Sequence, residues 1–389
     1  MAGAGPVPRG LPARPVRALH LVYELQRRGG LVAAGLCGGG GQGADHPRFR
    51  VSRVAPAVWR PPCSVSRVAT SASDIPEMVA RAHDGDPRAL ARLVSLIEDG
   101  SPRLRLVMRQ LAPLAGHARV IGLTGAPGAG KSTVTSALVR AYRDQGLRVG
   151  VLAIDPTSPF TGGALLGDRI RMQDHATDRD VFIRSMATRG HLGGLAAASP
   201  QVIRALDAAR FEVILIETVG VGQVEVEIAS MADSVAVLIV PGMGDSVQAA
   251  KAGILEIADV FVVNKADRPQ AQETIRDLRN MIALAERAPG DWKPPIVTTI
   301  ATTGEGIAEL VGKLDAHQSW LDNSGERDRR RAARARDEVA ALALGVLRGR
   351  MTRLPGDSAL GPLAERVASG QIDPYSAADE LLGALTDGA

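Results

Sequence analysis

Between residues 118 and 318, hydrophobic positions form short continuous runs instead of alternating with polar ones. The runs, rich in Val and Ile, lie at 120–123, 149–154, 181–185, 213–216, 235–240, 260–263 and 296–299. Continuous apolar runs are typical of strands buried on both faces, and the residues between most of them follow a helical period. This alternation predicts a doubly wound, mostly parallel α/β sheet, in which ligands bind at the carboxyl ends of the strands.

Helical patterns precede the α/β region. Asp86-Pro87 is a typical helix start, and the residues after it recur at i, i+3, i+4 and i+7 spacing, namely Leu90, Leu93, Val94 and Ile97. Gly100 ends this helix, and Ser101-Pro102 is expected to begin another. We therefore expect a helical segment over 73–114, packed on an α/β domain over 115–320.

A second helical region follows the α/β domain. Residues 326–350 open with a charged run and then carry Val339, Leu342 and Val346 on one face, while Asp373-Pro374 predicts the start of a last helix. A helical arm over 321–389 either packs on the domain or serves association. We favour dimerisation.

Composition changes the interpretation of the first 72 residues. The chain has 389 residues and a net charge of +4, but residues 1–70 hold ten arginines against two acidic residues, so the remainder is mildly acidic. That balance gives no basis for nucleic-acid binding. Low periodicity and abundant Gly, Ala, Pro and Arg indicate that 1–72 is a disordered extension, a mis-assigned start or a transit peptide.

Cysteine usage and hydropathy limit where the protein works. Both cysteines, Cys37 and Cys63, lie in the N-terminal extension, so the body can hold neither a disulfide scaffold nor a thiolate metal site. No apolar run approaches the ~18 residues of a membrane span. We expect a cytoplasmic protein, or a mitochondrial-matrix protein if 1–72 is a transit peptide, without membrane association.

The strongest motif joins the first strand to the next helix. Gly125-Ala-Pro-Gly-Ala-Gly-Lys-Ser132, followed by Thr133, has the spacing of a phosphate-binding P-loop. Gly125, Gly128, Ala129 and Gly130 would present backbone N–H groups to the phosphates, at the positive end of a helix dipole. Lys131 would reach the β- and γ-phosphates, and Ser132 can ligate Mg²⁺.

Base selection is predicted at the end of the strand at 260–263. Asn264-Lys265-Ala266-Asp267 places a carboxylate where it can accept hydrogen bonds from guanine N1–H and N2–H₂, a donor pair that adenine lacks. A backbone N–H near Ala301 would meet the guanine O6. The motif therefore favours GTP over ATP.

Acidic residues at neighbouring strand ends suggest a Mg²⁺ site. Glu217 follows the strand at 213–216, Asp155 follows the strand at 149–154, and Asp168 lies in a glycine-rich segment. Oxygen ligands suit Mg²⁺, although Asp155 and Asp168 could instead cap the following segments. We expect Gly220 to approach the γ-phosphate and the 217–223 segment, ending at Gln223, to orient the attacking water.

His191 and the other histidines offer no further metal site. His191 lies in a glycine-rich turn, where it could sit near the nucleotide or simply form part of the turn. The seven histidines otherwise show no metal-ligand spacing.

With these motifs in place, the chain resembles the MeaB/ArgK family of SIMIBI-class P-loop GTPases. The resemblance covers about residues 78–385 and rests on five segments: 125–133, 151–158, 161–172, 216–223 and 264–267. It implies a chaperone of an adenosylcobalamin-dependent acyl-CoA mutase, chiefly methylmalonyl-CoA mutase, that gates cofactor loading and protects the enzyme. It also implies a dimerising C-terminal arm and a switch loop at 242–251, where the sequence departs from the family pattern.

Three alternative functions differ in chemistry. A metallochaperone GTPase that loads nickel would need Cys or His ligands, and a kinase linked to amino-acid transport would need ATP preference. A non-catalytic nucleotide-dependent scaffold would use the same binding residues. We predict GTP hydrolysis at a slow intrinsic rate raised by the partner, because no arginine in the sequence stands out as a finger.

Overall fold

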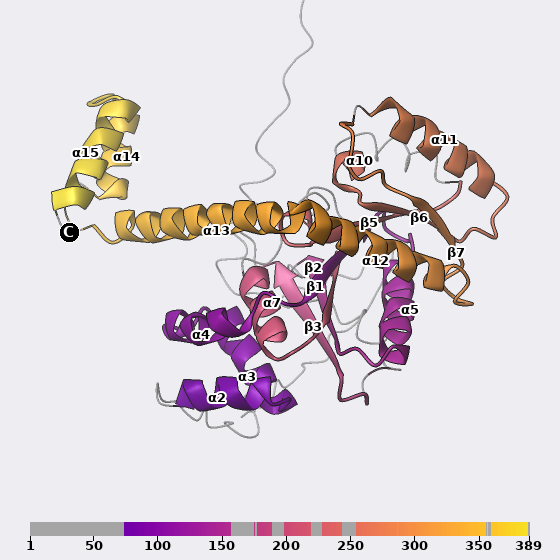
Figure 1. Ribbon diagram of the computed structural model, residues 1–389. Coiled ribbons are helices and arrows are strands. Elements are labelled where there is room, and N and C mark those ends of the chain that lie inside the picture. Colours follow the sequence, from indigo (N-terminus) through magenta and orange to yellow (C-terminus); the bar gives the residue numbers. More distant parts are fainter. Residues whose placement is uncertain are drawn as a thin grey trace, which may run out of the picture. The chain divides into compact units, whose positions relative to one another are not determined.

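The computed structural model describes residues 74–156, 175, 177–188, 198–218, 228–242, 254–285, 287–354, 356 and 359–387. Within these residues, seven strands form one sheet with the order β3-β2-β4-β1-β5-β6-β7, and every neighbouring pair is parallel (Figure 1). The prediction of a doubly wound α/β sheet is confirmed, and the sheet is wholly parallel. The strands are β1 (Arg119–Gly125), β2 (Val149–Pro156), β3 (Val181–Thr188), β4 (Val213–Thr218), β5 (Ser234–Ile239), β6 (Val260–Asn264) and β7 (Ile296–Thr299).

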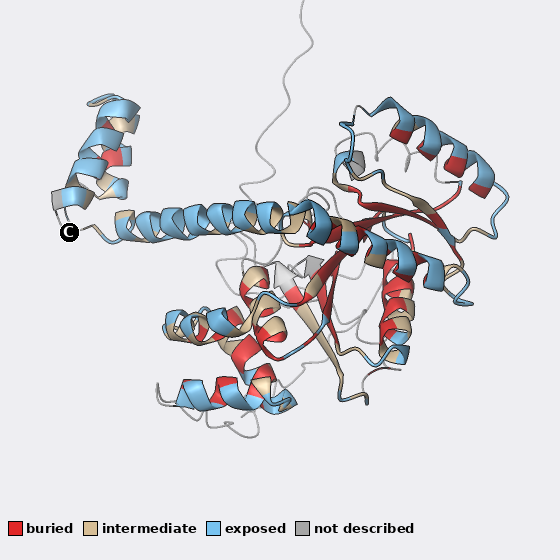
Figure 2. Ribbon diagram, in the orientation of Figure 1, coloured by how far each residue is buried: buried red, intermediate tan, exposed pale blue. Residues whose placement is uncertain are grey.

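Helices cover both faces of the sheet because its strands are apolar on both sides. One face packs against α5 (Lys131–Asp144) and α12 (Ile307–Ser324), and its strand residues include Val213 and Leu215. The other face packs against α7 (Ser199–Ala208) and α11 (Ala271–Leu284), and its strand residues include Ile214 and Ile216. Adjacent residues of β4 thus enter different cores. The central strands β1, β4, β5 and β6 are buried almost throughout, whereas the edge strand β3 is largely half-buried (Figure 2).

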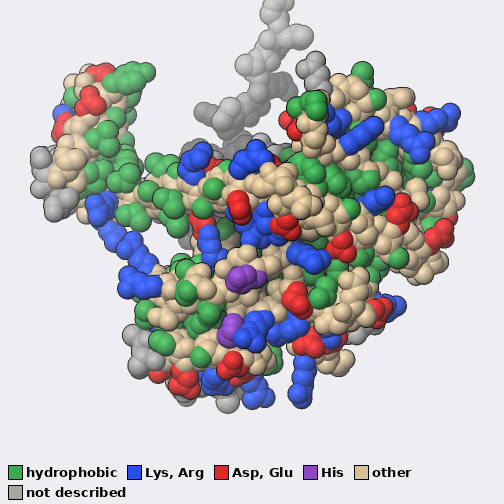
Figure 3. Space-filling model, in the orientation of Figure 1, with side chains coloured by type: hydrophobic (Ala, Val, Ile, Leu, Met, Phe, Trp, Pro, Cys, Tyr) green, Lys and Arg blue, Asp and Glu red, His purple; other side chains and the backbone are tan. Residues whose placement is uncertain are grey.

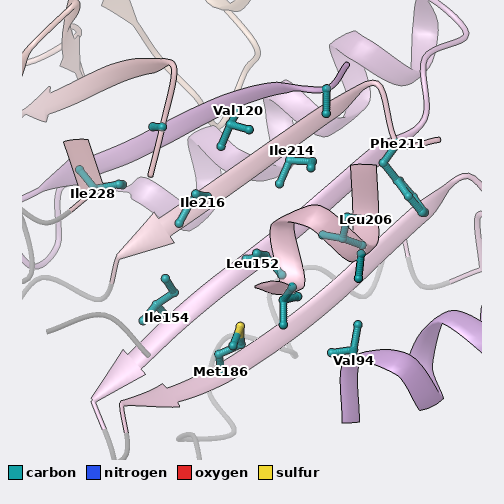
Figure 4. Packing of buried hydrophobic residues seen from close by; sticks show 14 of the residues in the cluster. Val94, Val120, Leu152, Ile154, Met186, Leu206, Phe211, Ile214, Ile216 and Ile228 are labelled. Carbon is teal, nitrogen blue, oxygen red and sulfur yellow. The ribbon is translucent and has the colours of Figure 1, made fainter. Parts of the chain in front are cut away.

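The helical segment before β1 joins the second of these cores. It comprises α2 (Asp74–His83), α3 (Pro87–Glu98), α4 (Leu104–Leu111) and η1 (Ala112–Leu114). Val94 of α3 packs in the same cluster as Leu206 of α7 and Leu152 of β2 (Figure 4). Asp86 caps α3 by accepting hydrogen bonds from the N–H groups of Arg88 (2.8 Å) and Ala89 (3.3 Å), as predicted.

The start of α4 was predicted too early. Ser101 Oγ accepts a hydrogen bond from the Arg103 N–H at 3.3 Å, and Ser101 O accepts one from the Leu104 N–H at 2.8 Å. These bonds form a turn, so that α4 begins at Leu104 and not at Ser101-Pro102.

The C-terminal region is helical, as predicted. It comprises α13 (Glu326–Met351), α14 (Leu360–Ala368) and α15 (Pro374–Asp387), while the short elements η3 (Ile228–Ser230) and α10 (Ile254–Ile257) lie beside β5 and β6 in sequence. Asp373 caps α15, accepting from the N–H groups of Tyr375 and Ser376 at 2.9 and 3.1 Å. No helix in the described part of the chain is long and apolar enough to cross a membrane.

Candidate nucleotide-binding site

The P-loop connects β1 to α5, and its course depends on glycine at two positions. Gly125 has φ 140°, and a Cβ there would lie 2.2 Å from Leu238 O on β5. Gly130, the N-cap of α5, has φ 86°, and a Cβ there would lie 2.4 Å from Asn264 Nδ2. Glycine is therefore required at both positions, for conformation and for space.

Lys131 lies where the motif predicts, at the first turn of α5. Its Nζ donates to Gly125 O at 2.6 Å and to Ala126 O at 3.1 Å, and the residue is buried. These contacts hold the ammonium group over the loop. The other predicted loop residues, Gly128, Ala129 and Thr133, lie in the same turn and in the first turn of α5.

Ser132 and Glu217 meet at the carboxyl ends of β1 and β4. Ser132 Oγ donates to Glu217 Oε1 at 2.5 Å, and both side chains are buried. A hydroxyl and a carboxylate side by side are hard oxygen donors, which is the donor set that Mg²⁺ prefers. The two residues therefore fit the metal site predicted for them.

The predicted base-recognition segment lies beside the P-loop. Asn264 Nδ2 donates to Ala129 O at 2.9 Å, and Asn264 Oδ1 accepts from Thr299 Oγ1 at 3.1 Å and from the Ala301 N–H at 3.3 Å. Lys265 Nζ donates to Gly128 O at 3.0 Å. Asp267 is exposed in the loop after β6, accessible to a base.

Ala301 has a different contact in this structure from the one expected with nucleotide. We predicted that an N–H near Ala301 would meet the guanine O6, and here that N–H donates to Asn264. Sequence reasoning placed Asn264 and Ala301 at one site but missed the hydrogen bond between them. The only available signal was that each follows a strand at the same edge of the sheet.

Several predicted site residues fall outside the described residues. They are Asp168, His191, Gly220 and Gln223. The extension over 1–72 and residues 243–251 of the expected switch loop also fall outside, whereas Gly242 is described. The backbone of Asp155 belongs to β2, whose last residue is Pro156, and the side chain of Asp155 is likewise outside the described residues. In the described part, no group of three or more His, Cys, Asp or Glu side chains could hold a metal ion by itself.

A parallel sheet with a P-loop after its central strand and a guanine-selecting motif two strands away defines a P-loop GTPase. The family model described as methylmalonyl Co-A mutase-associated GTPase MeaB matches residues 90–353. The chain therefore belongs to the MeaB family of GTPases and binds guanine nucleotides.

Individual relatives agree with the family. A Pyrococcus abyssi protein named as a GTPase is 49% identical over 317 residues, covering 81% of this chain and 98% of the relative. The mouse protein named methylmalonic aciduria type A homolog, mitochondrial, is 34% identical over 322 residues, covering 77% of each chain. The solved structure of a LAO/AO transport system kinase has a TM-score of 0.61 at 24% identity, covering 81% of this chain and 98% of that one, and so shares the fold.

Proposed function

We propose that this GTPase is a chaperone of an adenosylcobalamin-dependent acyl-CoA mutase, chiefly methylmalonyl-CoA mutase, whose cofactor loading it gates through GTP hydrolysis. The observation that carries the proposal is the family match over residues 90–353, because the family is described by its association with that mutase. The name of the mouse relative, which refers to methylmalonic aciduria, supports the same assignment.

The hydrolytic step is assigned to positioning and charge. Lys131 would leave the carbonyl groups of Gly125 and Ala126 for the β/γ-phosphate oxygens, where its charge offsets the negative charge that develops in the transition state. Mg²⁺ would be held by Ser132 and Glu217, with Asp155 and Asp168 as further candidates, and would supply charge neutralisation there. Gly220 and Gln223 are assigned to γ-phosphate contact and to orientation of the attacking water.

The C-terminal arm is assigned to homodimerisation. The exposed apolar residues of α13 lie in its carboxyl-terminal half: Val339, Leu342, Leu344, Val346 and Leu347. Figure 3 shows hydrophobic side chains gathered over this half of the helix and the helices after it. A second copy of the same helix would cover such a surface with matching chemistry.

GTP turnover with and without purified methylmalonyl-CoA mutase tests the proposal. We expect slow hydrolysis of GTP by the isolated protein, a rate raised at least tenfold by the mutase, and no comparable activity with ATP. Lys131→Ala should abolish both rates and so separates an enzyme from a nucleotide-dependent scaffold. Stimulation by no acyl-CoA mutase would refute the partner assignment while leaving the GTPase intact.

A further inference from the structure

A cavity lies at the amino ends of the strands, the opposite end of the sheet from the P-loop. It has a volume of about 500 Å³ and is formed where β1, β2 and β4 begin. An adjoining cavity of about 470 Å³ shares three lining residues with it: His83, Arg210 and Glu212. The nucleotide loops all follow the carboxyl ends of the strands, so these cavities are separate from the GTP site.

Arg210 has an unusual backbone conformation at this cavity. At the end of α7, the Arg210 N–H donates to Asp207 O at 2.8 Å and the Phe211 N–H donates to Leu206 O at 3.1 Å, which is a Schellman motif. Arg210 occupies the left-handed position with φ 63°. Four other helices in the described part of the chain end with the same pair of hydrogen bonds, and each has glycine there: Gly85, Gly100, Gly146 and Gly370.

An arginine in the left-handed region is less favourable than glycine, so its side chain is expected to serve a purpose. Part of that purpose is visible in a contact with α2. His83 Nδ1 lies 2.7 Å from Ala208 O, and because a carbonyl only accepts, Nδ1 carries the proton. His83 Nε2 therefore accepts from Arg210 Nε at 3.0 Å.

The contact with His83 fixes the guanidinium group but occupies only Nε. Among the described residues, neither Nη atom of Arg210 has a hydrogen-bond partner, and Arg210 lines both cavities. Two parallel Nη–H groups are the edge of a guanidinium that binds a carboxylate or phosphoryl group through two hydrogen bonds. The structural contact thus presents a positioned, unused anion-binding edge.

The acidic residues of the cavity are already engaged. Asp207 accepts from three successive backbone N–H groups, those of Gly116, His117 and Ala118, at 2.5 to 3.2 Å. Glu212 Oε2 accepts from the Arg148 N–H at 3.0 Å. In the described part of the chain, Arg210 donates to His83 and forms no ion pair with either carboxylate.

The remaining lining adds polar groups and an apolar wall. Arg119, whose Nη1 donates to Asp315 Oδ1 at 3.0 Å, and the His117 imidazole also line the cavity, together with apolar residues, namely Pro113, Leu114, Leu147 and Phe211. The volume lies within the range of about 300–1,000 Å³ found for small-molecule sites. On the face drawn in Figure 3, histidine and basic side chains, with acidic ones among them, lie over α7 and the helices before β1.

We propose that this cavity is a second ligand site, which takes an organic anion whose carboxylate or phosphoryl group is held end-on by Arg210. The apolar wall accommodates the body of the ligand. The site is independent of the guanine-nucleotide site and does not rest on the identity of the mutase partner.

Calorimetric titration of the full-length protein, saturated with GDP and Mg²⁺ so that the P-loop is filled, tests the site with three probes: hexanoate, acetate and inorganic phosphate. We expect hexanoate or phosphate to bind with a Kd of about 1 mM or below. Hexanoate binding tighter than acetate assigns a carboxylate with an apolar body, whereas phosphate binding assigns a phosphoryl group.

The decisive variant is Arg210→Gly, because glycine suits the left-handed position and the variant should fold. Its melting temperature should equal or exceed that of the wild type, while anion binding falls at least tenfold. Arg210→Lys, which keeps the charge without the fork, should also weaken binding. Arg279→Gln, an exposed arginine on α11, is the matched control and should bind as the wild type does.

Two results would overturn the proposal. One is the absence of binding by all three probes up to about 10 mM. The other is unchanged binding in Arg210→Gly, which would reduce Arg210 to its contact with His83.

Discussion

Asn264 shows how one side chain can connect loops that are distant in sequence. Its amide donates to Ala129 of the P-loop and accepts from Thr299 and Ala301 after β7. The residue is 2% exposed, and its hydrogen bonds to Ala129 and Thr299 are shielded from water. Asn264 therefore acts as a positioning residue that holds the phosphate loop and the base-side loop at a fixed separation.

Replacing Asn264 with Ala should weaken GDP binding by about tenfold or more and lower the free energy of unfolding by about 1–3 kcal/mol, because three polar groups lose their partner in a buried site. Titration with a fluorescent GDP analogue and urea unfolding measure the two effects. Thr299→Val, which removes only one of the three hydrogen bonds, is the matched control with a smaller effect. Equal losses in both variants would contradict a linking role for Asn264.

His317 of α12 and Asp259, just before β6, form a second buried polar site at the amino ends of β5 and β6. Ser234 Oγ accepts from Gln318 Nε2 at 2.7 Å and lies 2.6 Å from His317 Nδ1, and His317 Nε2 lies 3.2 Å from Asp259 Oδ1. The pKa of His317 is lowered to about 3, chiefly by burial and also by the charges of Arg330 and Arg327, against the opposing influence of Asp233. Burial raises the pKa of Asp259 to about 6 despite Arg330 and the Val235 N–H.

These two shifts have opposite effects on stability. His317 takes up a proton more readily in the unfolded chain than in the folded protein. The free energy of unfolding that depends on His317 therefore falls as the pH falls from 6.5 towards 3. Asp259 takes up a proton more readily in the folded protein than in the unfolded chain. The free energy of unfolding that depends on Asp259 therefore rises as the pH falls through 6 towards 3.8. Between pH 4 and 6 the two contributions offset each other.

Asp259→Asn should remove the rise in stability that Asp259 gives at low pH, so that the loss of stability due to His317 becomes measurable. From pH 6.5 to 4.5, the variant should lose about 1–2 kcal/mol more of its free energy of unfolding than the wild type does. Urea unfolding of both proteins at the two pH values measures the difference. Parallel stability curves would show that Asp259 is ionised throughout this range.

At the scale of elements, ionic contacts bind α13 to the starts of β5 and β6. Asp233 precedes β5, is 1% exposed and accepts from Arg331 Nη2 at 2.9 Å and Arg334 Nη2 at 2.5 Å. Burial raises the pKa of Asp233, but hydrogen bonds and charge from the two arginines outweigh it, and the pKa is lowered. Arg330 contacts Asp259, just before β6, at 3.3 Å. The carboxyl ends of the same two strands lead to the expected switch loop and to Asn264.

Asp233→Asn should destabilise the protein by about 2–4 kcal/mol, because it leaves two partly buried arginines without their carboxylate. Glu380→Gln, which breaks the more exposed pair between Arg366 and Glu380, should cost less than about 1 kcal/mol. Thermal or urea unfolding compares the two variants. Similar small effects would mean that α13 is held by apolar packing with α12 alone.

The sequence predicted elements well where burial determines the pattern. All seven strands lie where continuous Val- and Ile-rich runs predicted them, because a strand buried on both faces needs apolar residues throughout. Caps with a local signal, such as Asp86 and Asp373, were also correct. The start of α4 was wrong because Ser101 forms a turn with a similar local signal.

Contacts between distant residues could not be predicted in this way. Asn264 and Ala129 are 135 residues apart, and Asp233 and Arg334 are 101 apart. No periodicity relates such pairs, because they meet only after the sheet has placed their elements together. The arginines of α13 appear in the sequence as a charged run, and only the fold identifies Asp233 and Asp259 as their partners.

At the scale of the whole molecule, α13 changes character along its length. Its first half contacts the α/β core through ion pairs of Arg330, Arg331, Arg334 and Glu338, the last with Arg204. Its second half exposes apolar side chains, and Val339 and Leu344 are each 66% exposed. The ionic half fixes the helix to the sheet, and the apolar half is the part that proposed dimerisation would cover.

Leu342→Glu combined with Val346→Glu should therefore convert a dimer into a monomer, because two charges per chain would enter an apolar interface. Sedimentation velocity at about 10 µM protein measures the change, and intrinsic GTP hydrolysis should persist, since both residues lie on α13, outside the P-loop and the Asn264–Asp267 segment. Arg336→Gln, an exposed substitution on the same helix, should leave the dimer intact. A wild-type monomer at this concentration would contradict the dimer and leave the apolar half of α13 available to the mutase.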